Sequence, residues 1–187
     1  MKRLAFSVLI ASMSSSLAWA QDPGSTPTPL SATGQKARLG GGLVLGLPIG
    51  HWSDVTKFSV GGLADFDYAL LPELSLTGRA GFIYHVSNVD GASFFTIPVW
   101  SGVKYYLGQG HVRPFAAGEL GFNYNHASVE VFGQSVSSSS LNLGTNLGGG
   151  VEMGPISIRG FLAFLDLGSA SDSFEIMASA SYYFTAF

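Results

Sequence analysis

The sequence predicts an all-β fold, an eight-stranded antiparallel up-and-down transmembrane β-barrel. Apolar and polar residues alternate with a period of two along most of the chain, as they do in strands with two unlike faces. Charged residues make up 11% of the 187 residues, against about 25% in ordinary soluble domains. Because a soluble surface would need more charge, we expect one face of these strands to contact lipid.

The C-terminal segment, FEIMASASYYFTAF over residues 174–187, carries the clearest strand pattern. One parity is apolar, from Phe174 through Ile176 to Tyr182 and Phe184, and the other is small and polar. A strand in lipid must be hydrogen-bonded along both edges, because lipid offers no alternative partner. We therefore expect this last strand to close a barrel whose wall is formed by the preceding segments.

About eight alternating segments follow Lys36, separated by turn signals. We expect strands at 37–47, 58–69, 74–86, 94–107, 113–126, 139–152, 156–166 and 174–187. The connections at 71–73, 108–112 and 153–155 are short, whereas those around His51, Asp90, Phe132 and Ser171 are mostly longer and more polar. Short periplasmic turns and longer outer loops are typical of outer-membrane barrels.

The apolar face is expected to carry two girdles of aromatic residues, one at each edge of the bilayer, where amphipathic rings are favoured. Glycine, alanine and small aliphatic residues fill much of the band between them. The girdle residues are Phe58, Tyr68, Tyr84, Phe95, Tyr105, Tyr124, Phe164, Phe174, Tyr182 and Phe184.

The opposite face is expected to hold an ion network inside the barrel. Five positive and five negative charges should pair there, because an unpaired charge is costly in a lumen poor in water. Eight strands leave room only for their own side chains or one small ligand, so we expect a plugged barrel. The network residues are Arg38, Asp65, Asp67, Arg79, Lys104, Arg113, Glu119, Glu152, Arg159 and Glu175.

The N-terminus reads as an export signal. Residues 1–20 combine Lys2 and Arg3, an apolar run and the small residues Ala18 and Ala20 that favour cleavage. Residues 21–35 are rich in Pro, Ser and Thr and are expected to form a disordered periplasmic segment, which leaves 36–187 as the barrel. Removing two of nine basic residues leaves seven against twelve acidic ones, a net charge of −5. The expected location is the outer membrane of a Gram-negative cell.

The segment TIPVWSGVKYYLGQGHVRPFAAGELGFNY, Thr96 to Tyr124, resembles a hairpin of the small eight-stranded outer-membrane barrels of the OmpA and OmpX type. The resemblance extends over Lys36 to Phe187. It implies a monomeric outer-membrane β-barrel domain, with roles that differ between members. Two departures stand out. No peptidoglycan-binding domain follows the barrel, and Phe187 is out of phase with Phe184, on which the assembly signal of such proteins would then be centred.

Two His-x-Ser pairs, His85 with Ser87 and His126 with Ser128, could place an imidazole beside a hydroxyl, since residues i and i+2 share a strand face. The first resembles the His-x-Ser-Asn string of outer-membrane lipid A deacylases, although no matching acid is identified. A lipid A deacylase or acyltransferase using a rim His-Ser pair is therefore one alternative function. In the simpler interpretation both pairs are polar rim residues.

The preferred interpretation is a non-enzymatic outer-membrane barrel with a role in envelope integrity or surface interaction. A narrow solute channel and a soluble barrel with inverted faces are further alternatives. Expected partners are outer-membrane lipids, lipopolysaccharide and, during biogenesis, the barrel-assembly machinery. No cofactor or metal site is expected, because His51 and Asp54 are isolated ligands, and nothing indicates nucleic-acid binding.

Overall fold

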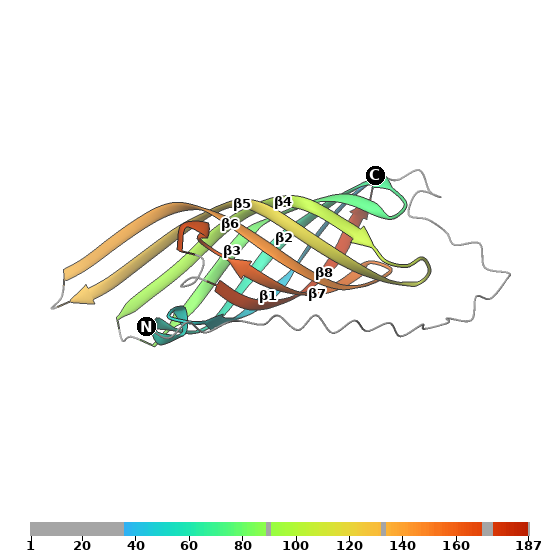
Figure 1. The fold of residues 1–187 in the computed structure, drawn as a ribbon. Coiled ribbons are helices and arrows are strands. Elements are labelled where there is room, and N and C mark those ends of the chain that lie inside the picture. Colours follow the sequence, from blue (N-terminus) through green and yellow to red (C-terminus); the bar gives the residue numbers. More distant parts are fainter. Residues whose placement is uncertain (1–35, 89–90, 132–133, 170–173, 187) are drawn as a thin grey trace, which may run out of the picture.

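Eight strands form one closed barrel in the computed structural model, which describes residues 36–88, 91–131, 134–169 and 174–186. The expected signal peptide and N-terminal segment lie outside the described residues. Each strand pairs antiparallel with the next, and β8 pairs with β1 to close the ring (Figure 1). The strands are β1 (Ala37–Ile49), β2 (Thr56–Leu71), β3 (Leu74–Ser87), β4 (Ala92–Tyr106), β5 (Val112–Val131), β6 (Gln134–Met153), β7 (Ile156–Phe164) and β8 (Phe174–Ala186).

The two ends of the barrel differ in their connections. Short links join β2 to β3, β4 to β5 and β6 to β7 at what we call the turn end. The opposite, loop end carries the helix α1 (Trp52–Val55) between β1 and β2 and the short 3-10 helix η2 (Leu167–Ser169) after β7. Among the described residues, no helix is long and apolar enough to cross a membrane.

The β5–β6 hairpin departs most from the predicted strand bounds. The sequence predicts strand ends at 126 and 139 with a polar loop around Phe132. Instead, β5 and β6 stay paired from Asn125 with Ser140 to Val131 with Gln134, and they project beyond the other strands at the loop end (Figure 1). Polar residues on both faces suit a ladder exposed to water on both sides, so a polar sequence here does not require a loop.

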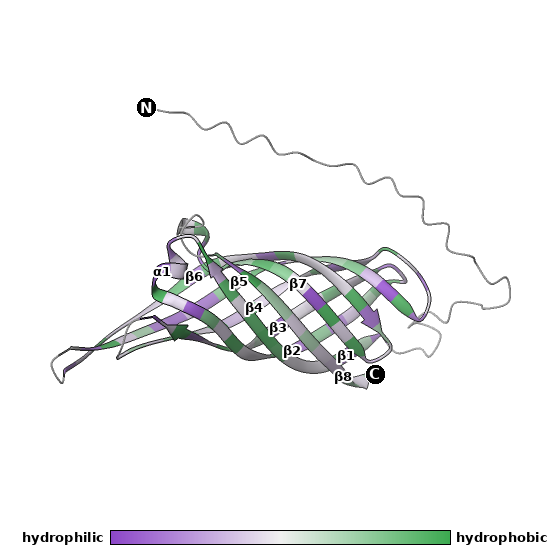
Figure 2. Cartoon of the chain, turned by 90° about the horizontal axis from the view of Figure 1, so that it is seen from below, coloured by the Kyte–Doolittle hydropathy of each residue, from purple (hydrophilic) through white to green (hydrophobic). Residues whose placement is uncertain are grey.

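The wall has an apolar outer face. On β1, Leu43, Leu45 and Leu47 are 59–70% exposed, whereas Val44 between them is 1% exposed. This alternation follows from the two-residue period of a strand, which sends successive side chains to opposite faces. Figure 2 shows hydrophobic and hydrophilic positions alternating along the strands. Among the described residues, charged side chains that are not buried all lie at strand ends or in connections.

Pro98 interrupts one ladder without shifting its register. The β3–β4 pairs run to Ala80 with Val99 and resume at Ile83 with Thr96, so two intervening pairs are missing. Proline has no N–H to donate, which explains the local break. On its other side, Pro98 pairs with Asn123 in an unbroken β4–β5 register. A proline inside the segment 94–107 is the sequence signal for such a break.

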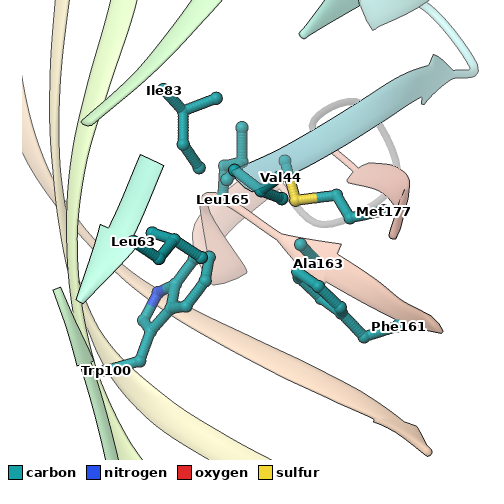
Figure 3. Close-up of a cluster of buried hydrophobic side chains, with 8 residues drawn as sticks. All are labelled: Val44, Leu63, Ile83, Trp100, Phe161, Ala163, Leu165 and Met177. Atoms are coloured by element: carbon teal, nitrogen blue, oxygen red, sulfur yellow. The ribbon is translucent and has the colours of Figure 1, made fainter. Parts of the chain in front are cut away.

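An apolar layer crosses the lumen towards the loop end (Figure 3). Its side chains come from most of the strands and are nearly inaccessible to solvent. Trp100 anchors the layer, since its indole N–H donates to Asn123 Oδ1 at 3.0 Å and its ring meets Phe161 edge-on. The layer consists of Val44, Leu63, Ile83, Trp100, Phe161, Ala163, Leu165 and Met177.

Glycine permits close strand approach at selected inward positions. A Cβ on Gly102 would fall onto the backbone oxygen of Gly118 and 2.6 Å from the Cα of Glu119. By contrast, a Cβ on Gly160 would meet no atom within 4 Å. Adding a methyl group should therefore reduce stability at Gly102 but not at Gly160.

We expect Gly102→Ala to lower the free energy of unfolding by about 1–3 kcal/mol, because the added methyl overpacks rigid backbone. Gly160→Ala should change it by less than about 1 kcal/mol and in the stabilising direction, by restricting the unfolded chain. Urea titration of the barrel refolded in detergent micelles measures both. Equal unfolding midpoints for the two variants would contradict this account.

Candidate functional site

The lumen holds the residues with the most distinctive chemistry. A first group, the turn-end charge layer, lies nearest the short turns. Arg38 donates to Asp67 Oδ2 and to Glu152 Oε1, both at 2.8 Å. Lys104 Nζ lies 2.6 Å from the same Asp67 oxygen. Because β1 and β6 are not neighbours in the ring, the bond from Arg38 to Glu152 spans the lumen.

Two inward tyrosines complete this layer. Tyr183 Oη donates to Asp67 Oδ2 at 2.7 Å, and Tyr106 Oη donates to Glu152 Oε2 at 3.0 Å. The Arg38 guanidinium also lies over the Tyr183 ring, 4.1 Å from its centroid. These contacts supply the additional hydrogen bonds that a buried ion pair needs to offset its desolvation.

A second group, the central charge layer, lies between the turn-end charge layer and the apolar layer. Arg79 Nε donates to Asp65 Oδ1 at 2.8 Å, and Arg159 Nη1 donates to Glu119 Oε1 at 2.8 Å. Asn146 Nδ2 donates to the second Glu119 oxygen at 2.8 Å. Arg79 also reaches Ser179 on β8 at 3.0 Å, a second bond across the lumen.

Arg113 does not lie in these layers, which corrects its predicted place in the lumen network. Its side chain is half-buried at the start of β5, its guanidinium donates to the backbone oxygen of Pro72 at 2.7 Å, and it stacks 3.7 Å from the centroid of Tyr106. The backbone oxygen of Pro72 and the Tyr106 ring hold the Arg113 guanidinium at the turn-end rim, where it stays partly exposed. The other nine residues of the predicted set are buried.

A third group lies on the loop-end side of the apolar layer and centres on His85 and Glu175, which are 1% and 0% exposed. His85 Nδ1 lies 2.6 Å from Ser59 Oγ and 3.0 Å from Glu175 Oε1. Its Nε2 lies 2.9 Å from Thr96 Oγ1. The Trp52 indole of α1 donates to Glu175 Oε1 at 2.7 Å, so this carboxylate ties the loop-end helix to the wall.

The hydrogen bonds around His85 suit a protonated ring. Ser59 donates to Glu175 at 2.9 Å, and Thr96 Oγ1 lies 2.7 Å from Asn125 Oδ1. When both hydroxyl protons point away from the ring, both ring nitrogens donate, as in an imidazolium, which would pair with Glu175.

A protonated His85 would balance the buried charges of the lumen. The buried acids number five, from Asp65 to Glu175, whereas the buried Arg and Lys side chains in the lumen number four. The His85 ring would then carry the fifth positive charge. The sequence does not reveal this role, because the partners Ser59, Thr96 and Glu175 come from three other strands. The one available signal is that His85 shares the parity of Arg79 on the same strand.

The two His-x-Ser pairs are not equivalent in the structure. His85 points into the lumen, and Ser87 donates to the backbone oxygen of Val55 at 3.2 Å. His126 stacks on Phe95 with 4.9 Å between centroids, and its Nδ1 lies 2.9 Å from Ser139 Oγ. Ser128 pairs with Ser93 of β4 on one side and with Ser137 of β6 on the other.

An acid partner for His85 is present after all, but the arrangement is that of an ion pair. Ser59 and Glu175 share one ring nitrogen of His85, whereas a proton relay needs the hydroxyl and the carboxylate on opposite nitrogens. Thr96 occupies the opposite nitrogen, and its side chain is 2% exposed and also contacts Asn125 Oδ1. The hydroxyls of Ser59 and Thr96 thus add hydrogen bonds around the buried pair.

The predicted girdle residues all lie on the outer face or at its rims, with none of the ten buried. Tyr68, Tyr105, Tyr182 and Phe184 belong to the turn end. At the loop end, Phe95 packs beside Phe82 and Tyr124, and Phe164 stacks on Phe174 with centroids 5.8 Å apart. These contacts link neighbouring strands by cross-strand aromatic pairs.

A cavity of about 230 Å³ lies on the loop-end side of the His85–Glu175 pair. Most of the surface that lines it is apolar, including that of Trp52, Phe94 and Leu165. The polar groups in the lining include those of Thr96 and Asn125. Within the residues that the structure describes, no three His, Cys, Asp or Glu side chains are grouped to hold a metal ion.

Comparison with known proteins identifies the fold. Ail, the attachment invasion locus protein of Yersinia pestis, matches with a TM-score of 0.60 and 16% sequence identity over 80% of this chain and 97% of Ail. The Neisserial surface protein A matches with a TM-score of 0.52 and 14% identity over 79% of this chain and 97% of that protein. No family model and no curated protein matches the chain. The chain is thus an eight-stranded antiparallel barrel with the fold of these small bacterial barrels.

Breaking the Arg79–Asp65 pair should test the central charge layer. We expect Arg79→Met to lower the free energy of unfolding by about 3–5 kcal/mol, because Asp65 is left buried without its partner. The double variant Arg79→Met with Asp65→Leu should recover much of that loss. Urea titration in micelles measures the cycle, and a double variant no more stable than Arg79→Met would contradict it.

The charge on His85 is directly measurable. We expect ¹⁵N NMR of the histidine rings in the neutral-pH barrel to show both His85 nitrogens protonated, and to show one of them unprotonated in Glu175→Gln, which removes the compensating charge. His111, exposed near the turn end, is the internal reference. One unprotonated His85 nitrogen in the unchanged chain would refute the assignment.

Proposed function

We propose that this protein is an integral outer-membrane β-barrel with a plugged lumen, which contributes to envelope integrity or to surface interactions and is not an enzyme. One observation carries the proposal. The outer face is a continuous apolar band, and eight of the nine Arg, Lys, Asp and Glu side chains buried in the lumen form two paired layers on the turn-end side of the apolar layer. This arrangement, apolar outside and charged inside, is the inverse of a soluble protein, and it is stable only where lipid replaces water around the wall.

The layered lumen argues against the channel alternative. The apolar layer lies across the lumen, with the Trp100 ring edge-on to Phe161, and it has no charged side chain to coordinate an ion. The bonds from Arg38 to Glu152 and from Arg79 to Ser179 cross the lumen beneath it. A solute would have to disrupt the apolar layer and these bonds across the lumen, which argues against a channel.

The surface role is supported by the loop end. There the β5–β6 hairpin extends past the other strands, with Val136 and Leu141 66% and 67% exposed. We place this end outside the cell and the turn end in the periplasm, since short turns face the periplasm in such barrels. Lipid and lipopolysaccharide would contact the girdles, and the assembly machinery would act during insertion of a monomer.

Cysteine labelling tests location and orientation together, because the chain has no cysteine of its own. We expect Ser137→Cys in the hairpin to react with a membrane-impermeant maleimide on intact cells. The matched variant Gln109→Cys, exposed at the turn end, should react only after the outer membrane is broken. Labelling of both variants in intact cells, or of neither, would contradict the proposal.

A further inference from the structure

The cavity beside the His85–Glu175 pair lies at the mouth of the lumen. Its volume of about 230 Å³ is below the roughly 300–1,000 Å³ of sites for drug-sized ligands, so it suits a molecule with a single ring. Leu165 belongs both to its lining and to the apolar layer, which closes the cavity towards the turn end. The exposed residues Ser138 and Ser140 also line it, which leaves it open to a molecule that arrives at the loop end.

Part of the lining is aromatic. The Trp52 ring lies edge-on to Phe94 with 6.0 Å between centroids, and edge-on to His85 with 5.5 Å. Leu165 and Ala127 add aliphatic surface to the same lining. Aromatic rings attract a further ring in edge-on or offset geometry beyond the gain from buried area. The lining therefore favours an aromatic occupant over a straight alkyl chain, which gains only the buried area.

The cavity also contains amide groups that the protein itself leaves unused. Among the described residues, the side chain of Asn142 makes no hydrogen bond, although it is half-buried in the lining. The Asn125 side chain is bonded only through its Oδ1, to Thr96, so its NH2 group is available. An occupant with a carbonyl oxygen would accept from these amides, whereas a hydrocarbon would leave them without a partner, which weakens binding.

Charge and polarity narrow the class of occupant further. Among the described residues, no Lys or Arg lines the cavity, whereas the acidic Asp166 does. His85 already lies 3.0 Å from Glu175 Oε1, so a positive charge on its ring is matched. An anion would therefore lose its water without gaining a counter-charge. A sugar is uncharged, but in a mostly apolar lining several of its hydroxyl groups would be buried without partners.

We propose that this loop-end cavity binds a small uncharged molecule with one aromatic ring and one oxygen that accepts hydrogen bonds. The ring lies against Trp52 and Phe94, and the oxygen accepts from the amides of Asn125 and Asn142. The proposal deepens the surface role and rests on it, because the molecule must reach the cavity from outside the cell. Since the apolar layer closes the cavity below, the molecule is held at the mouth of the barrel and does not pass through it.

Four probes separate the possible ligand chemistries. Benzamide carries the proposed ring and oxygen, hexanamide replaces the ring by an alkyl chain, methyl glucoside is a sugar, and benzoate adds a negative charge. We expect benzamide to bind with a dissociation constant of about 1 mM or below, and the other three to bind roughly tenfold more weakly. Saturation-transfer NMR titrations of the full barrel in detergent micelles, corrected with protein-free micelles, measure the four constants.

Variants of the barrel locate the site. Ser140→Phe places a ring in the cavity and should abolish benzamide binding, whereas the matched Ser137→Phe places it on the opposite face of β6 and should leave the constant unchanged. Asn142→Leu removes one amide and should weaken binding by about three- to tenfold. Each variant is compared in its folded, heat-modifiable form, and Ala127→Phe replaces Ser140→Phe if that variant does not fold.

Several results would overturn the proposal. Absence of benzamide binding, or unchanged affinity in folded Asn142→Leu or in the ring-filled variant, would rule out this cavity as the site. Tighter binding of hexanamide, methyl glucoside or benzoate than of benzamide would overturn the ligand class in favour of an alkyl chain, a sugar or an anion. Failure of the proposed location would appear separately, in the cysteine labelling of intact cells, because the probe titrations use the purified barrel.

Discussion

Closure of the ring between β1 and β8 is the constraint on which the rest of the structure depends. These strands pair from Arg38 with Ala186 to Ile49 with Phe174, with one register shift after Leu39. A sheet surrounded by lipid cannot leave edge N–H and C=O groups unpaired, since no water replaces the missing bonds. Closure in turn creates an inside and an outside, and the two-residue period of each strand assigns every side chain to one of them.

The charged and polar side chains that are excluded from the outer face must then lie inside the barrel. Charges buried in a narrow lumen are tolerated only in pairs, and the structure arranges them in two layers with bonds that cross between non-neighbouring strands. On the far side of the apolar layer, Glu175 Oε1 lies 3.0 Å from His85 Nδ1. Trp52 donates to the same carboxylate, which links α1 to the wall of the barrel.

The constraint relaxes where the wall extends beyond the other strands. Beyond Thr145, no described residue pairs as a strand with the β7 side of β6, which water permits but hydrocarbon does not. The loop end also carries the cavity over the His85–Glu175 pair.

The sequence by itself determined the eight strands, their inward and outward faces and the aromatic rims, because these follow from a local alternation that each strand carries alone. Most strand ends lie within two residues of their predicted positions. Only the tertiary structure decided the length of the β5–β6 hairpin, since its polar residues fit a loop and a hydrated ladder equally well. It also decided that Arg113 lies at the rim and that Ser59, Thr96 and Glu175 meet the buried imidazole of His85. Those outcomes depend on strand stagger and on contacts across the lumen between residues up to 116 positions apart, which local patterning does not encode.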